Sequence, residues 1–337
     1  MPDLSTRYMG ITLRNPFIAG ASKLTGDIPT IMKLEEAGAG AIVTSSLFEE
    51  QIRIEREWLE DYFLDHGGMH QTELNLPSYS PYSYPEDHLQ WLKSAAESVS
   101  IPVIASLNAF RRETWVQWSR KLEDCGVEGL ELNFYSTPLD QGKDASEIED
   151  DQIQVLMEIK EKVKIPVSVK MSPFYTNPLN MASRFSKAGA DGIVMFNRFF
   201  QPDIDPDSMK HIFRFDLSQP MENRLPLRFI ALLHGRIHGD LCASSGIHKG
   251  TDAIKMFLAG AAAVQMVSSL YTKGTGYLED MIRELENWMN SRGFTRINDF
   301  RGQMDKLHSS DPYAYERAQY VKILLQSRES IKGYPLI

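Results

Sequence analysis

Short hydrophobic stretches alternate with longer amphipathic ones through most of the chain. Eight hydrophobic stretches have the length and composition of buried β-strands, at residues 17–21, 41–44, 103–107, 129–133, 167–171, 192–196, 240–243 and 263–267. The amphipathic segments at 28–37, 113–125, 148–163, 178–188 and 251–259 are predicted as helices. Several of them end in glycine just before the next strand, and glycine is the usual helix stop. Eight β-α repeats joined by short turns predict an α/β fold, a parallel (β/α)8 TIM barrel.

Three segments do not fit the plain repeat, although we expect residues 1–337 to form one domain. Residues 47–85 are long, polar and aromatic, and they follow the second strand on the face where barrels keep their active sites. We interpret them as a lid or pocket wall, with a mere surface excursion as the alternative. Residues 201–226 are an insertion after the sixth strand, and residues 277–337 are expected to form a helical tail packed outside the barrel.

Composition narrows the possible partners and the compartment. The net charge is −9 and no long basic run is present, which argues against nucleic acid as a main partner. Cys125 and Cys242 have no metal-binding spacing and form no disulfide framework, which fits a reducing cytoplasm. The N-terminus lacks the apolar core of a signal peptide, and no stretch approaches the roughly 18 apolar residues of a membrane span. We therefore expect a cytoplasmic protein without a membrane partner.

The fifth strand carries a lysine in an otherwise apolar run, Val167-Ser168-Val169-Lys170-Met171. Both faces of a strand are covered in a buried parallel sheet, so Lys170 is expected to point into protein. A buried ammonium is costly unless an anion meets it. Three interpretations follow: a cation that holds the electron-rich edge of a flavin, a buried ion pair with Glu131, or a Schiff-base nucleophile of the kind that barrel aldolases use.

Catalytic groups of such barrels lie at the carboxyl ends of the strands. In order, these ends are Ala21-Ser22, Ser45-Ser46, Asn108, Asn133, Lys170, Asn197, Ser245-Gly246 and Val267-Ser268. The set is poor in acids and rich in amides, which suits a planar heteroaromatic ligand better than a metal or a glycoside. The loops after the seventh and eighth strands are the usual phosphate cradle of these barrels, with a tight turn and a helix cap as the alternative.

The fourth strand and its loop supply two further candidates. Asn133 ends the strand and could bond both cofactor and substrate, or it could be a satisfied structural asparagine. Ser136 lies three residues further on, where a serine is more often a turn or cap residue than a catalytic one.

Together, these strand ends resemble the dihydroorotate dehydrogenase family of FMN-dependent barrels, over nearly the whole chain. The resemblance rests on the order and spacing of Asn15-Pro16-Phe17, Ala21-Ser22, Val43-Thr44-Ser45-Ser46, Glu131-Leu132-Asn133, Val169-Lys170-Met171-Ser172-Pro173, Asn197, Ser245-Gly246-Ile247 with Gly250, Asp252 and Ala253, Gly260-Ala261, Val264-Gln265 and Ile297-Asn298-Asp299-Phe300-Arg301-Gly302.

The resemblance implies a two-step cycle. A base removes a proton from the substrate while hydride passes to flavin N5, and a second substrate then reoxidises the flavin. By position, Ser136 is implied as the base and Lys170 as the cation near flavin N1. The implied flavin contacts are Ala21, Ser22, Ser45, Asn108, Asn133, Lys170, Asn197, Ser245, Gly246, Val267 and Ser268, and the implied substrate contacts are Ser78, Asn133, Asn197 and Arg198. An unassisted serine is a poor base near neutral pH, so Ser136 would need an activating hydrogen bond or water chain.

Departures from the family pattern gather on the substrate side. Ser45 stands where the family has a lysine, Ser78 ends what is a Gly-Leu-Pro-Asn loop in the family, and Arg198 replaces a serine. Thr137-Pro138 follows Ser136, so the asparagine of the family's Ser-Cys-Pro-Asn loop is gone. Each group of orotate left unpaired would cost about 1–3 kcal/mol. We expect the flavin half of the site to be better preserved than the substrate half, and Arg198 is the candidate for the missing cation.

The leading hypothesis is a cytoplasmic, homo-oligomeric (dimeric) FMN-dependent enzyme that oxidises dihydroorotate to orotate. The alternatives are a flavin enzyme for another dihydropyrimidine or an enone, a Schiff-base lyase that uses Lys170, and a non-catalytic flavin-binding barrel. The sequence leaves open whether fumarate, a nicotinamide acting through a partner subunit, or another oxidant takes the electrons.

Overall fold

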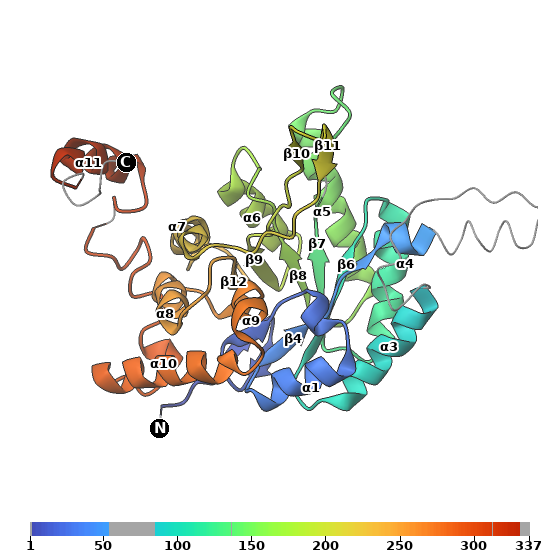
Figure 1. Cartoon of the computed structure of the whole chain (residues 1–337), viewed down its shortest axis with the longest axis horizontal. Helices are drawn as coiled ribbons and strands as arrows, with labels where there is room; N and C mark the ends of the chain where they lie inside the picture. The colour runs from blue at the N-terminus through green and yellow to red at the C-terminus, as the bar shows by residue number, and fades with distance from the viewer. Residues whose placement is uncertain (1, 54–84, 136, 312, 331–337) are drawn as a thin grey trace, which may run out of the picture.

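A closed barrel of eight parallel strands forms the centre of the molecule (Figure 1). The computed structural model describes residues 2–53, 85–135, 137–311 and 313–330. The barrel strands are β3 (Phe17–Ala19), β4 (Ala41–Val43), β6 (Val103–Asn108), β7 (Gly129–Asn133), β8 (Val167–Lys170), β9 (Gly192–Met195), β12 (Asp240–Ser244) and β13 (Ala263–Met266). Each pairs with the next in parallel, and β13 pairs with β3 to close the barrel. The short strand β5 (Leu47–Phe48) pairs with the carboxyl end of β6, beyond the part of β6 that pairs with β4. All eight predicted strands and the predicted barrel are confirmed.

Helices surround the barrel. They are α1 (Ile28–Glu36), α3 (Pro85–Ser98), α4 (Arg112–Glu123), α5 (Ala145–Lys162), α6 (Pro178–Lys187), α7 (Arg224–Leu233) and α8 (Gly250–Ala259). The five predicted helices are confirmed to within a few residues at each end. Neither α3 nor α7 was predicted from the sequence, and the predicted insertion ends at Pro226, inside α7. Proline is compatible with the first turn of a helix, because an N–H there has no intrahelical partner in any case.

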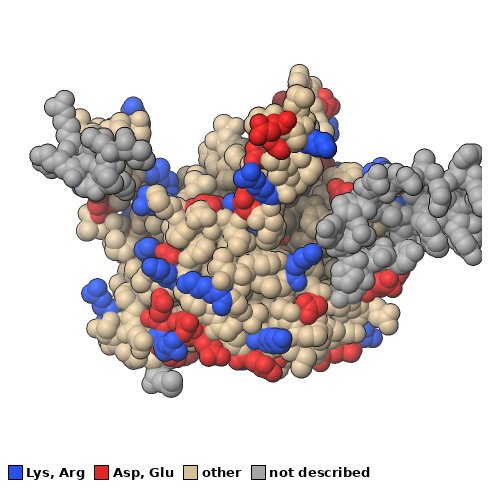
Figure 2. Space-filling view, in the orientation of Figure 1, with Lys and Arg blue, Asp and Glu red and all other residues tan. Residues whose placement is uncertain are grey.

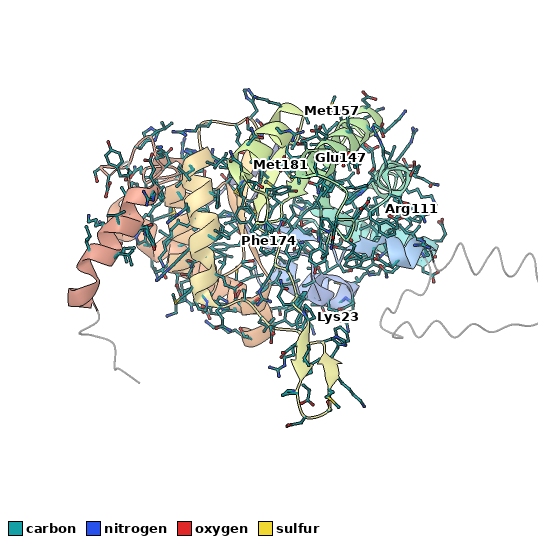
Figure 3. The ribbon with its side chains drawn as sticks, turned by 90° about the horizontal axis from the view of Figure 1, so that it is seen from above. Lys23, Arg111, Glu147, Met157, Phe174 and Met181 are labelled. Atoms are coloured by element: carbon teal, nitrogen blue, oxygen red, sulfur yellow. The ribbon has the colours of Figure 1, made fainter. Side chains whose placement is uncertain are left out.

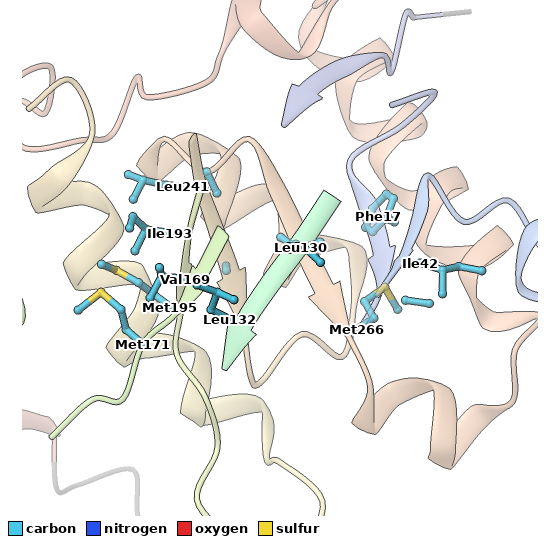
Figure 4. Packing of buried hydrophobic residues seen from close by; sticks show 14 of the residues in the cluster. Phe17, Ile42, Leu130, Leu132, Val169, Met171, Ile193, Met195, Leu241 and Met266 are labelled. Atoms are coloured by element: carbon cyan, nitrogen blue, oxygen red, sulfur yellow. The ribbon is translucent and has the colours of Figure 1, made fainter. Parts of the chain in front are cut away.

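Alternation along the strands divides the hydrophobic residues between two layers. Outward-facing side chains, among them Leu132, Val169, Ile193 and Met195, pack under the surrounding helices (Figure 4). Inward-facing side chains pack against an N-terminal hairpin formed by β1 (Thr6–Tyr8) and β2 (Ile11–Leu13). This inner cluster consists of Tyr8, Met9, Leu13, Ile18, Ala41, Val43, Ile104, Val194, Cys242, Ala262 and Ala263. The hairpin thus fills one end of the barrel with apolar groups, and the polar inward-facing residues lie toward the other end.

The segments outside the plain repeat have distinct structures. The insertion after β9 forms a hairpin of β10 (Asp203–Asp205) and β11 (Lys210–Ile212), which projects from the barrel (Figure 1), followed by the short helix η2 (Pro220–Asn223). Most of the predicted lid, residues 54–84, lies outside the described residues. In the tail, α10 (Tyr277–Arg292) packs on α8, η3 (Ile297–Asp299) follows, and α11 (Arg317–Ser330) lies apart from α10 in Figure 1.

The surface carries mixed charge. On the face drawn in Figure 2, lysine and arginine side chains are dispersed among acidic ones, which gather along the lower edge. Within the described ranges, no helix has the length and apolar character needed to cross a membrane. The same residues contain no group of three or more His, Cys, Asp or Glu side chains placed to hold a metal ion.

His88 makes stability depend on pH. It lies in α3 at 3% exposure, with its ring centroid 5.3 Å from that of Trp91, and burial lowers its pKa from 6.5 to about 4. Between these two pH values the unfolded chain binds a proton that the folded chain excludes, so stability falls as the pH falls through this window. We expect a loss of about 3 kcal/mol in the free energy of unfolding between neutral pH and pH 4 from this group. Urea denaturation of the wild type and of His88→Phe measures this loss. The slope of the unfolding free energy against pH should differ between the two proteins from pH 4 to 6.5 and should be the same above pH 7. Equal slopes between pH 4 and 6.5 would contradict the assignment.

Candidate active site

The carboxyl ends of the barrel strands meet on the side from which the β10–β11 hairpin rises (Figure 1). Seen from above, Phe174, which follows β8, lies near the middle of the view (Figure 3). Lys23 and Arg111, which follow β3 and β6, lie further out (Figure 3). The candidate residues predicted from the strand ends therefore surround one mouth, as parallel strands in a closed barrel require.

Lys170 is held inside the barrel by two partners. Its Nζ donates to Gln265 Oε1 at 2.8 Å and lies 3.4 Å from Glu131 Oε1. Gln265 Nε2 donates in turn to Glu131 Oε2. The side chains of Lys170 and Glu131 are 7% and 1% exposed. The burial predicted for Lys170 is confirmed, and the ion pair with Glu131 is present.

Three asparagines form a chain of hydrogen bonds across the mouth. Asn197 Nδ2 donates to Asn133 Oδ1 at 2.6 Å, and Asn108 Nδ2 donates to the Asn133 carbonyl oxygen at 2.7 Å. These residues come from β6, β7 and the turn after β9. The structure therefore brings together three of the predicted contact residues. Each amide side chain both donates and accepts, so the chain offers either kind of group to a heterocyclic ring.

The predicted residues after β3 and β4 meet around Thr25 in the short helix η1 (Lys23–Thr25). The Ser22 N–H donates to Thr25 Oγ1 at 3.1 Å, and the Ser45 N–H donates to the Thr25 carbonyl at 3.2 Å. Ala21 packs against the inner cluster of the barrel. Ser22 also hydrogen-bonds Tyr271, whose pKa is raised by burial and partly restored by that bond. This side of the mouth thus carries hydroxyl groups, and position 45 is occupied by a serine and not by a lysine.

The loops after β12 and β13 are joined by a serine from the insertion. Ser218 donates to Ser268 Oγ through its N–H and its hydroxyl, each at 2.9 Å, and its hydroxyl accepts from the Gly246 N–H at 3.2 Å. Ser245 and Gly246 have φ of +78° and +73°, a left-handed conformation that turns the backbone sharply. Val267 caps the short helix α9 (Ser268–Lys273). The predicted phosphate loops therefore lie together, with Ser218 as an unpredicted third component.

The remaining predicted substrate residues are placed differently. Arg198 pairs with Glu222 through Nε at 3.1 Å and donates to the Asp216 carbonyl, so its guanidinium is bound to the insertion. Ser78 and the implied base Ser136 lie outside the described residues. A substrate role for these residues, Arg198 included, stays a prediction.

A cavity of about 760 Å³ opens beside Asn108 and Tyr135. Its described lining is largely apolar and aromatic: Phe48, Glu50, Gln51, Asn108, Ala109, Phe110, Tyr135, Thr137 and Leu139. Tyr135 stacks on Phe199 with ring centroids 4.3 Å apart, and Phe199 in turn contacts the edge of Phe174. These rings give the mouth a hydrophobic wall next to the asparagine chain, which is the usual composition of a small-molecule site.

Comparison with known proteins identifies the family. The family model for dihydroorotate dehydrogenase matches residues 3–289, which include the whole barrel and its insertions. The chain belongs to the dihydroorotate dehydrogenase family. Members of this family are FMN-dependent oxidoreductases that act on CH–CH groups, as the sequence resemblance implied.

Curated relatives match this chain over almost their full lengths. The catalytic subunit of dihydroorotate dehydrogenase B (NAD(+)) from Thermoplasma volcanium is 29% identical over 311 residues, which cover 90% of this chain and 98% of the relative. The same subunit from Thermoplasma acidophilum is 27% identical and covers 90% and 99%. That from Methanocaldococcus jannaschii is 26% identical and covers 87% and 95%. Identity at this level fits the departures found at Ser45 and around Ser136.

The polar groups of this site fit both ends of an FMN molecule, the flavin ring and the phosphate. Lys170 and the asparagine chain supply a cation and amides for the polar edge of a flavin ring. The Ser268 hydroxyl accepts both bonds from Ser218, so its own proton remains to be donated to a phosphate. The hydroxyl of Ser269, in the first turn of α9, is fully buried and has no hydrogen-bond partner in the described part of the chain. Polar groups of this kind at the two phosphate loops have the chemistry of an anion cradle.

The sequence predicted no role in the site for Gln265, Ser218 or Tyr271. Gln265 had a usable signal, because it is a polar residue in the buried strand Ala263–Met266, as Lys170 is in its own strand. Ser218 had none, since the insertion around it has no periodic pattern that places one serine over the barrel.

We expect the Lys170–Glu131 pair to show strong energetic coupling. Lys170→Met leaves a carboxylate buried without its cation, and it should lower the free energy of unfolding by about 3–5 kcal/mol. Lys170→Met combined with Glu131→Gln removes both charges and should recover most of this loss. Urea denaturation of the two single variants and the double variant measures the coupling energy. Lys187→Met on the exposed surface of α6 is the control, and additive losses in the double variant would contradict the coupling.

Proposed function

We propose that this chain is an FMN-dependent dehydrogenase that oxidises dihydroorotate to orotate in pyrimidine biosynthesis. The observation that carries the proposal is a buried lysine at the end of β8, beside a chain of three asparagines, in a barrel of the dihydroorotate dehydrogenase family. When bound, FMN supplies the acceptor for the hydride that leaves the substrate.

The residues of the mouth have separate tasks in this proposal. Lys170 would hold the polar edge of the flavin ring and supply a positive charge there. Asn133 and Asn197, fixed by their mutual hydrogen bond, orient ring and substrate against each other. Tyr135 and Phe199 form part of the wall that keeps water from the reacting atoms. Ser136 is the residue that the family resemblance assigns to proton abstraction.

We further propose that the enzyme works in the cytoplasm as a homodimer. Support for the compartment comes from Cys125 and Cys242, which are both free thiols. Support for the small-molecule substrate comes from the size and apolar lining of the mouth cavity. Light scattering of the purified chain should give twice the mass of 38.3 kDa.

Flavin bleaching tests the activity. Protein incubated with FMN and desalted should keep the flavin absorbance, and anaerobic dihydroorotate should bleach it. NAD+ and fumarate, added separately, should show which oxidant restores the colour. Lys170→Ala should slow bleaching by about 100-fold, because it removes a preorganised charge from the site. Lys187→Ala, on the exposed end of α6, should leave the rate unchanged.

Two outcomes would contradict the proposal in different ways. Loss of all flavin on desalting would refute FMN as the cofactor. Retained flavin that dithionite bleaches and dihydroorotate does not would refute dihydroorotate as the substrate.

A further inference from the structure

Lys170, Gln265 and Glu131 form a closed ring of contacts between three strands. Gln265 Oε1 accepts from Lys170 Nζ at 2.8 Å, Gln265 Nε2 donates to Glu131 Oε2, and Glu131 Oε1 lies 3.4 Å from Lys170 Nζ. The three residues belong to β8, β13 and β7, and β7 and β8 are adjacent in the barrel. Each side chain therefore restrains the other two.

The chemistry of the three groups fixes their arrangement. An ammonium can only donate and a carboxylate can only accept, so the amide oxygen of Gln265 must face Lys170 and its NH₂ must face Glu131. A neutral amide has both an acceptor and a donor, so it can join a cation and an anion with a good hydrogen bond to each. The shorter contact of Lys170 is with this neutral oxygen, and its distance to the carboxylate is long for a hydrogen bond.

This arrangement places a carboxylate beside Lys170 without letting it bind the ammonium tightly. All three side chains are buried, with Gln265 at 1% exposure, so charge interactions here are screened far less than at the surface. Cys242 lies close enough to interact with both charged groups, but burial raises its pKa well above the usual value and it stays an uncharged thiol. The charge at this point of the barrel is therefore set by Lys170 and Glu131.

We propose that Glu131 and Gln265 are positioning residues that set how strongly Lys170 favours the reduced form of the bound flavin. Reduction adds negative charge to the ring, which Lys170 attracts and Glu131 repels. Gln265 bonds both charged groups and holds the ammonium in place. The inference rests on the proposed FMN function, and it assigns the tuning of the flavin potential to two residues that do not need to touch the flavin.

Two nearly isosteric substitutions of opposite charge test the proposal. Glu131→Gln removes a negative charge next to Lys170 and should favour reduced over oxidised FMN by about tenfold, which raises the two-electron midpoint potential by about 30 mV. Gln265→Glu adds a negative charge and should lower the potential by a similar amount. Glu161→Gln makes the first change on the exposed surface of α5 and should leave the potential as in the wild type.

The midpoint potential is measured by equilibration against a reference dye in protein loaded with FMN, with circular dichroism to check the fold. Loosened packing alone would move both variants in the same direction, so opposite shifts support the proposal. Shifts of one sign, or none, in protein that retains FMN would overturn it while leaving the proposed function intact. A wild type that does not bind FMN would overturn both. If one variant does not fold, the sign of the shift in the other decides.

Discussion

The structure depends on keeping a charged pair inside a closed sheet. Lys170 and Glu131 lie on adjacent strands of a barrel in which every strand is hydrogen-bonded on both sides. Ions buried in this way destabilise a fold unless their remaining hydrogen-bonding capacity is met, and Gln265 meets it from a third strand. The pair can be tolerated only while the barrel is closed, so the polar end of the barrel and its closure support each other.

The barrel interior is divided along its axis. One end is filled by Tyr8, Met9 and Leu13 of the N-terminal hairpin, which bury apolar surface against the inner faces of the strands. The other end holds the charged pair and the asparagine chain, and it opens to the aromatic wall around Tyr135. A firm apolar base under a polar mouth gives the catalytic groups fixed positions, which is what stabilisation of a developing charge requires.

The insertion after β9 links the two halves of the site. Ser218 joins the loops after β12 and β13, while Arg198 and Glu222 pair at the base of the same insertion. This segment contacts both the phosphate loops and the side of the mouth where the chain departs from its family. It is therefore well placed to reshape the substrate side of the site without disturbing the flavin side.

The sequence by itself determined the barrel. Strand length, alternation and the glycine stops located all eight strands, and strand order then placed Lys170, Asn133 and Asn197 at one mouth, because these signals are local and a closed parallel sheet brings all carboxyl ends together. The sequence could also have indicated Gln265, a polar residue in a buried strand. It could not show that Gln265 bridges Lys170 and Glu131, that Ser218 joins the two loops, or that Arg198 is bound to Glu222. The first contact joins residues 95 and 134 positions apart, and such pairings have no local signal, because they exist only once barrel closure and the packing of the insertion have brought the side chains together.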